Sequence, residues 1–442
     1  MQIVEWKKKK LKKLVVKMKV RVINLGCKVN TYESEYVMSS FKDKGYEITD
    51  GIADIYVVNT CSVTNTSDAK SRKVINRLVR ENENSIIVVM GCMIEAHKDI
   101  KLDGVSIIIG NKDKAKVVSL VEEYIKTREK KRILYEDFDS TFEDMFITNM
   151  ESRHRAFVKI EDGCENFCSY CIIPYTRGRV RSKNPDTIIK EIKSLVKNGY
   201  KEVVLTGIHT GHYGSDIDTS FPELLKRIVK IEGLKRLRIS SIEITELNDD
   251  FLSVLKDNPV IVSHLHIPLQ AGSDKILSLM NRKYLTPYFL DKVEKIREIR
   301  PNINLTTDVI VGFPGETEED FLDTINFCQE VKFTKIHVFP YSRRKGTKAD
   351  LMDEQIPENV KKERVKRLME VSNNLEKEYL DKFISTTVSV LIEENKDGYS
   401  IGHTGNYLKV KIPGNIKCNE IVSVKIIKRE NLELVGEYEK DR

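Results

Sequence analysis

The clearest signal in the sequence is the stretch Gly163-Cys164-Glu165-Asn166-Phe167-Cys168-Ser169-Tyr170-Cys171. Three and then two residues separate its cysteines, so one short loop can bring three thiolates to a single metal site. The loop favours a [4Fe–4S] cluster with one open iron, because structural zinc takes four ligands and the sequence offers no fourth ligand nearby. A zinc knuckle, or a group of cysteines in a core, is the alternative. An open iron can chelate the amino and carboxylate groups of S-adenosylmethionine (SAM) and pass an electron to it.

The residues around this loop alternate between strand and helix patterns. Strands are predicted at residues 156–161, 202–206, 236–242, 264–269, 305–311 and 335–339, with helices between them. Asn184 followed by Pro185 is typical of a helix start, as an N-cap and a first-turn proline. This order predicts an α/β fold with an open (β/α)6 barrel, a partial form of the TIM barrel. The cysteine loop follows the first strand, at the barrel end where such folds carry their chemistry.

Three earlier apolar runs also end at a cysteine. Residues 20–26 lead to Cys27, residues 55–60 to Cys61 and residues 86–91 to Cys92, with helix patterns at 32–44 and 67–81. Spacings of 34 and 31 residues match one βαβ unit each, and the carboxyl ends of consecutive parallel strands share one sheet edge. We therefore expect Cys27, Cys61 and Cys92 to hold an auxiliary [4Fe–4S] cluster in a parallel α/β domain. The alternative is that parallel strands simply accept small residues after them.

Two asparagines, Asn30 and Asn59, lie close in sequence to the first two of these cysteines. They are candidate hydrogen-bond donors around a cluster and its ligands. Capping of a helix or a turn is an equally good interpretation.

The composition shifts divide the chain into five segments: a basic leader (1–18), the first α/β domain (19–132), a linker (133–152), the barrel (153–375) and a C-terminal module (376–442). A further strand is predicted at 105–109, and a helix pattern follows until charged residues at 127–132 interrupt it. Residues 140–155 are polar and weakly periodic, which is typical of a linker. Residues 356–380 show a long, charged helix pattern that would close the barrel.

After this helix the pattern becomes that of short strands, predicted at 386–393, 399–404, 407–412, 421–429 and 432–438. They predict a small antiparallel β-barrel similar to an OB-fold. Lys409, Lys411 and Lys425 belong to a basic run that only Glu420 offsets within residues 409–429. Together with Tyr407 these lysines predict a modest RNA-binding surface. A barrel that merely stabilises the chain is the alternative.

The 442 residues carry a formal net charge of +7, and residues 1–20 alone account for it, with eight lysines and one glutamate. The leader is interpreted as a disordered segment, as the result of a start placed too early with Met18 as the true start, or as an arm that attracts phosphate. The sequence contains no run of 18 apolar residues, so no membrane span is expected. Eight cysteines in so long a chain, six of them in metal-like groups, indicate a reducing cytosol instead of a disulfide scaffold.

The cysteine motif resembles that of the radical SAM superfamily, and residues 163–179 look like its methylthiotransferase branch. Residues 25–35, Leu-Gly-Cys-Lys-Val-Asn-Thr-Tyr-Glu-Ser-Glu, resemble the opening of the amino-terminal domain of that branch. Residues 26–35, 205–211 and 402–410 look most like the MtaB-type group within it. The C-terminal module resembles a TRAM domain, a tRNA-binding appendage. The lysine-rich leader departs from the family pattern.

Residues at the barrel strand ends are candidate SAM contacts, and the set is Tyr170, Gly207, Ser241, Glu243, Gln270, Gly312 and Gly315. Ser241 and Glu243 offer polar groups for ribose hydroxyls or for the methionine part of SAM. The resemblance implies that Gly207 lies at the SAM amino group and that a glycine pair near Gly312 lets main chain pack on adenine. Tyr170 would border the same adenine. Ordinary barrel packing is the alternative for each residue alone.

Basic residues flank the cysteine loop and follow the sixth barrel strand. Arg177, Arg179 and Arg343 are predicted to contact RNA phosphates, with a solvated charged face as the alternative. The histidines His209, His212, His264, His266 and His337 lack metal-ligand spacing with the cysteines and are interpreted as surface or core residues.

The resemblance implies methylthiolation of C2 in N6-threonylcarbamoyladenosine of tRNA, with the anticodon stem-loop as partner. SAM would donate a methyl group and yield a 5′-deoxyadenosyl radical that breaks an unactivated C–H bond, while the second cluster holds sulfur. We expect an electron donor such as flavodoxin or ferredoxin, and a cytoplasmic monomer. The alternatives are isopentenyl-type adenosine or a ribosomal protein aspartate as substrate, and a non-catalytic iron–sulfur RNA-binding protein.

Overall fold

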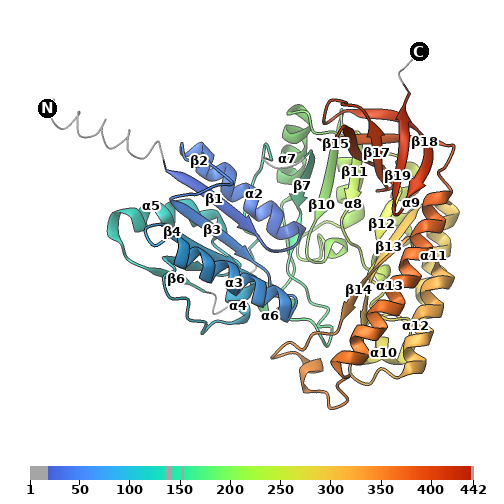
Figure 1. The fold of residues 1–442 in the computed structure, drawn as a ribbon, viewed down its shortest axis with the longest axis horizontal. Coiled ribbons are helices and arrows are strands. Elements are labelled where there is room, and N and C mark those ends of the chain that lie inside the picture. The colour runs from blue at the N-terminus through green and yellow to red at the C-terminus, as the bar shows by residue number, and fades with distance from the viewer. Residues whose placement is uncertain (1–17, 135–140, 151–153, 440–442) are drawn as a thin grey trace.

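The computed structural model describes residues 18–134, 141–150 and 154–439 (Figure 1). Residues 1–17 of the predicted leader lie outside these ranges. In the described ranges, none of the helices combines the length and the apolar character that crossing a membrane requires.

The first part of the chain is a parallel sheet with helices on both faces. Its strand order within the described residues is β2-β1-β3-β4-β5-β6, and each neighbouring pair is parallel. The strands are β1 (Lys19–Asn24), β2 (Glu47–Ile48), β3 (Ile55–Thr60), β4 (Ile86–Gly91), β5 (Ile107–Ile109) and β6 (Lys131–Ile133). The helices are α2 (Lys28–Asp43), α3 (Asn65–Glu81), α4 (Cys92–Ala96) and α5 (Val117–Thr127).

Strand side chains alternate between two apolar cores, one on each face of this sheet. Ile55 and Val57 of β3 pack in the core that contains Phe41 of α2 and the apolar side of α5. Tyr56 and Val58 pack in the other core, beneath α3 and α4. A parallel sheet covered on both faces explains the nearly continuous apolar strands, and the predicted α/β class is confirmed.

The two edge strands were not predicted from the sequence. β6 occupies part of the charged stretch that predicted an interruption, yet Ile107 and Lys131 pair across the ladder. An edge strand bonds to one neighbour only, so the exposed side chain of Arg132 is compatible with it. β2 is two residues long, which is too short to produce a recognisable pattern.

The central part is an arc of parallel strands covered by helices (Figure 1). The strands are β7 (Arg155–Lys159), β10 (Glu202–Thr206), β11 (Arg236–Ile239), β12 (His264–His266), β13 (Asn304–Val311) and β14 (Lys335–Pro340). The helices are α7 (Pro185–Lys197), α8 (Phe221–Ile228), α9 (Asp249–Asp257), α10 (Asp274–Leu279), α11 (Thr286–Ile299) and α12 (Glu318–Val331). Asn184 caps α7 by accepting from the backbone N–H groups of Asp186 and Thr187, as predicted.

The ladder of the arc is divided between β11 and β12 into two three-stranded halves of the described structure. Three backbone bonds of the described residues connect the halves: Leu237 N–H donates to Val260 O at 2.7 Å, Val262 N–H donates to Leu237 O at 3.0 Å, and Ile242 N–H donates to His266 O at 3.0 Å. The order is therefore that of the predicted partial (β/α)6 barrel. Met145, Ile147 and Met150, in the stretch predicted as a linker, are buried in the barrel core.

The C-terminal part is a closed barrel preceded by α13 (Glu358–Asp381), which packs along β14. Its strands are β15 (Thr387–Lys396), β16 (Tyr399–Thr404), β17 (Lys409–Pro413), β18 (Ile421–Glu430) and β19 (Glu433–Tyr438). The order is β15-β16-β17-β19-β18, and β17 pairs with β19 in parallel. The other neighbouring pairs are antiparallel, so the predicted small antiparallel β-barrel is confirmed, with this one pair as an exception.

This small barrel is docked on the amino ends of the central strands. Arg236 and Arg238 of β11 donate to the carbonyls of His403 and Gly405, each at 3.0 Å. Asn304 at the start of β13 donates to the carbonyl of Asn406 at 2.7 Å. The opposite barrel end, where the strands finish, stays available for the cysteine loop and its partners.

Candidate functional site

The loop that carries Cys164, Cys168 and Cys171 follows β7 and lies at the carboxyl end of the central strands. Its two ends are joined by a short antiparallel pair, β8 (Glu161–Asp162) with β9 (Arg181–Ser182). Burial raises the pKa of Cys164, and the charges of Cys171 and Cys168 raise it further. The three cysteines thus share one loop and act on one another electrostatically, and their binding of a cluster stays a prediction.

The surroundings of this trio suit thiolate ligands. The backbone N–H groups of Asn166 and Ile173 donate to the sulfurs of Cys164 and Cys171. Arg282 donates from Nη1 to Cys168 Sγ at 3.2 Å. Donors of this kind stabilise the negative charge that iron-bound sulfur carries. Three cysteines on one loop, with such donors around them, therefore fit a [4Fe–4S] cluster.

The second trio, Cys27, Cys61 and Cys92, lies at the carboxyl ends of β1, β3 and β4. Burial raises the pKa of Cys61, and the charges of Cys92 and Cys27 raise it further. Parallel strands bring them to one sheet edge, as the βαβ spacing predicts. This trio has the same donor chemistry as the first, and it faces the barrel.

Asparagines surround the second trio. The Cys27 thiol donates to Asn30 Oδ1 at 3.2 Å, and Asn30 Nδ2 donates to Asn59 Oδ1 at 2.9 Å. Asn111, which the sequence did not suggest, donates to Cys92 Sγ at 3.4 Å and to the carbonyl of Thr176 at 2.8 Å. Because Thr176 belongs to the short helix α6 (Ile173–Arg177) that follows Cys171, Asn111 links the two cysteine sites.

Arg177 is the one predicted RNA contact that the structure contradicts. Its side chain is fully buried, and its Nη1 lies 3.1 Å from Glu33 and 3.0 Å from Asp162. It cannot reach RNA, because α2 covers it from the first domain. The prediction followed from its position beside the loop, which says nothing about the domain packed above it.

Arg177 is part of a buried ion network that joins the first domain to the barrel. Glu33 of α2 lies 2.5 Å from Lys114 Nζ and 3.1 Å from Lys159 Nζ, and Lys159 lies 2.6 Å from Asp162. Burial alone would raise the pKa of Glu33, but Lys114, Arg177 and Lys159 hold it below its usual value. The network thus keeps a carboxylate charged between the two cysteine sites. The charge of Arg177 also acts on Cys92 and Cys27.

The residues predicted to contact SAM lie at the same barrel rim as the first trio, beyond the ends of β10 to β13. Tyr170 is beside the ring of Phe313, with ring centroids 6.5 Å apart. Burial raises the pKa of Tyr170, and the charges of Cys168 and Glu243 raise it further. Glu243 forms an ion pair with Arg282, which is the same arginine that donates to Cys168. Arg282 was missed because it lies in a loop without a motif.

The remaining predicted SAM residues are backbone features. Gly312 and Gly315 have φ angles of +71° and +81°, which favour glycine. Gln270 also has a positive φ of 71°, and its backbone forms an isolated parallel bridge with Val309. Ser241 is half-buried after β11. Whether these residues contact SAM stays a prediction.

A buried carboxylate, Glu161, lies next to Gly207. A Cβ at Gly207 would lie 2.6 Å from Glu161 Oε2, so the glycine makes room for this carboxylate. Glu161 Oε2 accepts from the backbone N–H of His209 at 2.7 Å. Burial raises the pKa of Glu161 well above its ordinary value.

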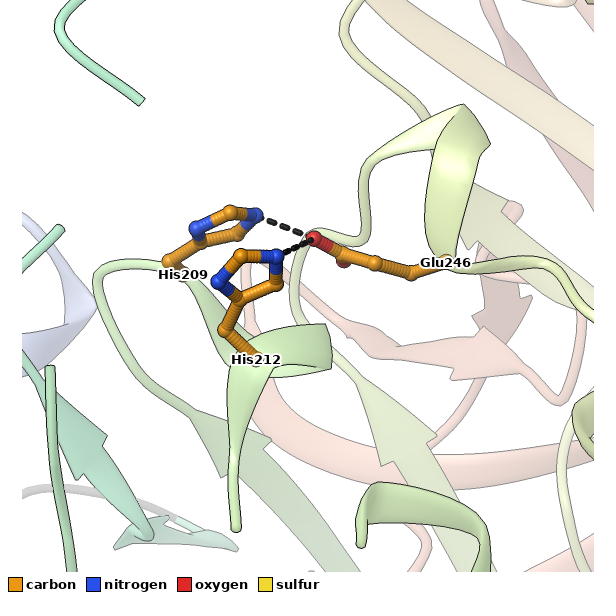
Figure 2. Close-up of side chains that lie close together, drawn as sticks. All are labelled: His209, His212 and Glu246. Carbon is orange, nitrogen blue, oxygen red and sulfur yellow. Dashed lines mark ion pairs between the residues drawn. The ribbon is translucent and has the colours of Figure 1, made fainter. Parts of the chain in front are cut away.

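Two of the histidines form a cluster with Glu246 beside the first trio (Figure 2). His209 and His212 are stacked at a centroid distance of 3.8 Å, and both Nε2 atoms face the Glu246 carboxylate. His209 Nδ1 lies 3.7 Å from Cys164 Sγ. A second group, His266, Asp308 and His337, lies on β12 to β14. Sequence spacing could not reveal either group, because each draws residues from separate strand ends or strands.

The other predicted RNA contacts lie at the surface. Arg179 is 87% exposed, and Arg343 is paired with Asp350 at 2.9 Å. Lys425 is exposed on β18. Lys409 and Lys411 both pair with Glu433 of β19, so their charge is offset by a residue outside the segment that predicted a basic surface.

Comparison with known proteins agrees with this arrangement. Residues 158–328 match the radical SAM superfamily, and residues 19–110 match a family described as uncharacterized protein family UPF0004. The chain is 44% identical to "Threonylcarbamoyladenosine tRNA methylthiotransferase MtaB" of Bacillus subtilis (strain 168), over 91% of this chain and 92% of the relative. It is 37% identical to "tRNA-2-methylthio-N(6)-dimethylallyladenosine synthase" of Clostridium perfringens (strain SM101 / Type A), over 93% and 96%.

Among solved structures, the radical SAM methyltransferase TsrM from Kitasatospora setae, with cobalamin and a [4Fe–4S] cluster bound, superposes with a TM-score of 0.55. The alignment covers 73% of this chain and 75% of TsrM at 15% identity, so this likeness concerns the fold alone. The sequence relatives go further, because they match nearly the whole chain. Superfamily membership brings SAM and a [4Fe–4S] cluster as cofactors. With its motif, its barrel and its full-length relatives, the chain belongs to the radical SAM methylthiotransferase family.

Proposed function

We propose that the protein is a tRNA methylthiotransferase that modifies C2 of N6-threonylcarbamoyladenosine next to the anticodon. The observation that carries this function is the 44% identity to a relative of that name over 91% of the chain. The two cysteine trios, each at the carboxyl ends of strands in a separate parallel sheet, support it.

Two [4Fe–4S] clusters are proposed, one on each trio. A cluster with an open iron at the first trio supplies the one-electron cleavage of SAM that activates an unreactive C–H bond. Cys164, Cys168 and Cys171 would hold it, with Tyr170 and Glu243 next to the SAM that it binds. Cys27, Cys61 and Cys92 would hold the auxiliary cluster, whose role is to present sulfur. SAM would also donate the methyl group.

The anticodon stem-loop of tRNA would bind across the barrel mouth and the C-terminal barrel. Arg179, Arg343 and Lys425 are exposed and would contact phosphates there. We propose that the C-terminal barrel is a TRAM-type RNA-binding module. An external electron donor of the flavodoxin or ferredoxin type, and a monomeric cytoplasmic enzyme, complete the proposal.

A second candidate substrate is N6-dimethylallyladenosine in tRNA. It is favoured by the relatives at 37% identity that carry this nucleoside in their name. The higher identity of the threonylcarbamoyladenosine relative makes this the weaker candidate.

Mass spectrometry of tRNA nucleosides separates the two substrates. Deletion of the gene should remove the methylthio derivative of N6-threonylcarbamoyladenosine and leave its precursor, and the wild-type gene should restore it. The dimethylallyl derivative should not change. Loss of the dimethylallyl product alone would favour the second candidate, and no change in either nucleoside would reject both.

A further inference from the structure

A lysine directly after the first ligand of the second trio differs from the cations that surround it. Lys28 is the first residue of α2, and both it and Cys27 are exposed. The charge of Lys28 acts on Tyr407 of the C-terminal barrel and on His264 and His337 of the central barrel. The side chain therefore lies among three parts of the molecule, which leave it exposed to solvent and yet surround it enough that burial lowers the pKa of Lys28.

The histidines show which side of the barrel this space borders. Leu265 of β12 packs in the helix-covered core, so its neighbours His264 and His266 point to the barrel interior. The same alternation holds on β14, where Ile336 is in the core and His337 is exposed. Lys28 thus faces the polar inner surface of the barrel, from the edge of the first domain.

The other cations near this space are already engaged. Arg155 lies 3.0 Å from Glu393, and Arg238 lies 2.6 Å from Glu202. Both guanidinium groups also lie over the ring of Tyr407. His266 faces Asp308 at 3.2 Å. Lys28, by contrast, forms no hydrogen bond or ion pair with the residues that the structure describes.

The position of Lys28 is also unfavourable for the helix. The amino end of a helix carries partial positive charge, so a cation in the first turn is destabilising. Neither the helix nor an ion pair accounts for this charge. A carboxylate on a bound ligand would pair with this charge and so account for it.

The proposed substrate has such a group. The threonylcarbamoyl substituent ends in the carboxylate of threonine, whereas a dimethylallyl substituent is neutral and apolar. In adenine, C2 and C6 both flank N1, so a substituent on the C6 amine extends from the ring edge that includes C2. A residue beside the sulfur-presenting site at C2 is therefore well placed to reach this substituent.

We infer, on the basis of the proposed function, that Lys28 binds the carboxylate of the threonylcarbamoyl group and selects this nucleoside over the dimethylallyl one. The ammonium donates charge-assisted hydrogen bonds to the carboxylate. Lys28 acts in specificity, not in the chemical step. It also orients the base, because the planar carbamoyl group and one tetrahedral carbon are all that separate the carboxylate from the adenine.

The test measures binding of three anticodon stem-loops to the reconstituted holoenzyme with SAM. One RNA carries N6-threonylcarbamoyladenosine, the second its carboxylate methyl ester, and the third N6-dimethylallyladenosine. The variants are Lys28→Gln, Lys28→Arg and, as matched control, Lys44→Gln, an exposed lysine at the other end of α2. The two lysines are separated by the length of this 16-residue helix, about 24 Å.

Wild-type enzyme should bind the acid roughly 10- to 100-fold more tightly than the ester, as expected for a hydrogen bond to a charged group. Lys28→Gln should reduce this ratio to within about twofold, whereas Lys28→Arg and Lys44→Gln should keep most of it. The ratio is internal to each preparation, so loss of a cluster in a variant would not imitate the result. A Lys28→Gln ratio equal to that of the wild type would overturn the inference.

Conversion of the same RNAs by the wild type separates this failure from failure of the proposed function. If wild type methylthiolates the threonylcarbamoyl RNA and Lys28→Gln keeps its acid preference, only the role of Lys28 is wrong. If wild type converts the dimethylallyl RNA and not the threonylcarbamoyl RNA, the proposed substrate is wrong, and the role of Lys28 with it.

Discussion

Replacement of Glu33 by glutamine tests the buried ion network between the first domain and the barrel. In the wild type, two buried carboxylates, Glu33 and Asp162, lie among the cations Lys114, Lys159 and Arg177. Glu33→Gln leaves three buried cations against one carboxylate. Removal of one partner from a buried pair typically costs about 3–5 kcal/mol, because the remaining charge is left desolvated and uncompensated. Most of the cost comes from Lys114, since Glu33 is its ion-pair partner and the Lys114 side chain is fully buried.

The assay is urea denaturation followed by hydrogen exchange of individual peptides, because a chain of several domains need not unfold in one step. With a urea m-value of about 2 kcal/mol/M, this loss of stability lowers the urea midpoint by roughly 1.5–2.5 M. The shift should be seen in the unfolding transition that the peptides of α2 report. Glu47→Gln is the matched control in the same domain. Its partner Lys19 is 3.7 Å away, both side chains are about half exposed, and such pairs contribute less than about 1 kcal/mol.

A second substitution separates charge from packing. The double variant Glu33→Gln/Lys114→Met removes the cation that Glu33→Gln strands, so part of the lost stability should return. If Glu33→Gln behaves like Glu47→Gln, the buried charges do not hold the two parts together, and the reasoning is refuted.

Three further outcomes are expected. Cys92→Ala should reduce the iron content from about eight to about four atoms per chain and abolish the methylthio nucleoside, while reductive cleavage of SAM persists. His209→Leu removes an imidazole that lies 3.7 Å from a thiol of the first trio, and should shift the reduction potential of that cluster by on the order of tens of millivolts in an EPR-monitored titration. Glu433→Gln releases the two lysines of β17 from their ion pairs, and should tighten binding of an anticodon stem-loop by roughly 3- to 10-fold at low salt.

Each of these has its own control. An iron content near eight in Cys92→Ala would remove the second trio as a cluster site. For His209, the variant His212→Leu is the comparison, because its ring has no contact with the thiols in the described structure; equal shifts in both would indicate a general loss of structure. For Glu433, an affinity gain that persists at high salt would show that charge is not its cause.

Sequence patterns were sufficient for the class of fold and for the grouping of the cysteines. Both are local properties: loop spacing brings Cys164, Cys168 and Cys171 together, and each βαβ unit returns the chain to the same sheet edge. The barrel order followed from strand and helix periods in the same way. The six central strands that were predicted all occur, although several end earlier than expected.

What the sequence did not reveal depends on how separate parts pack. Arg177 reads as a surface charge until α2 covers it, and Lys409 reads as unpaired until β19 brings Glu433 beside it. His209 meets Glu246 because two loops leave neighbouring strands at the same rim. The patterns of single segments determined which groups are chemically suitable and which elements form. Only the tertiary structure decided which charges are paired and which, like Lys28, are left for a ligand, because Coulomb energy depends on distance and burial and not on position along the chain.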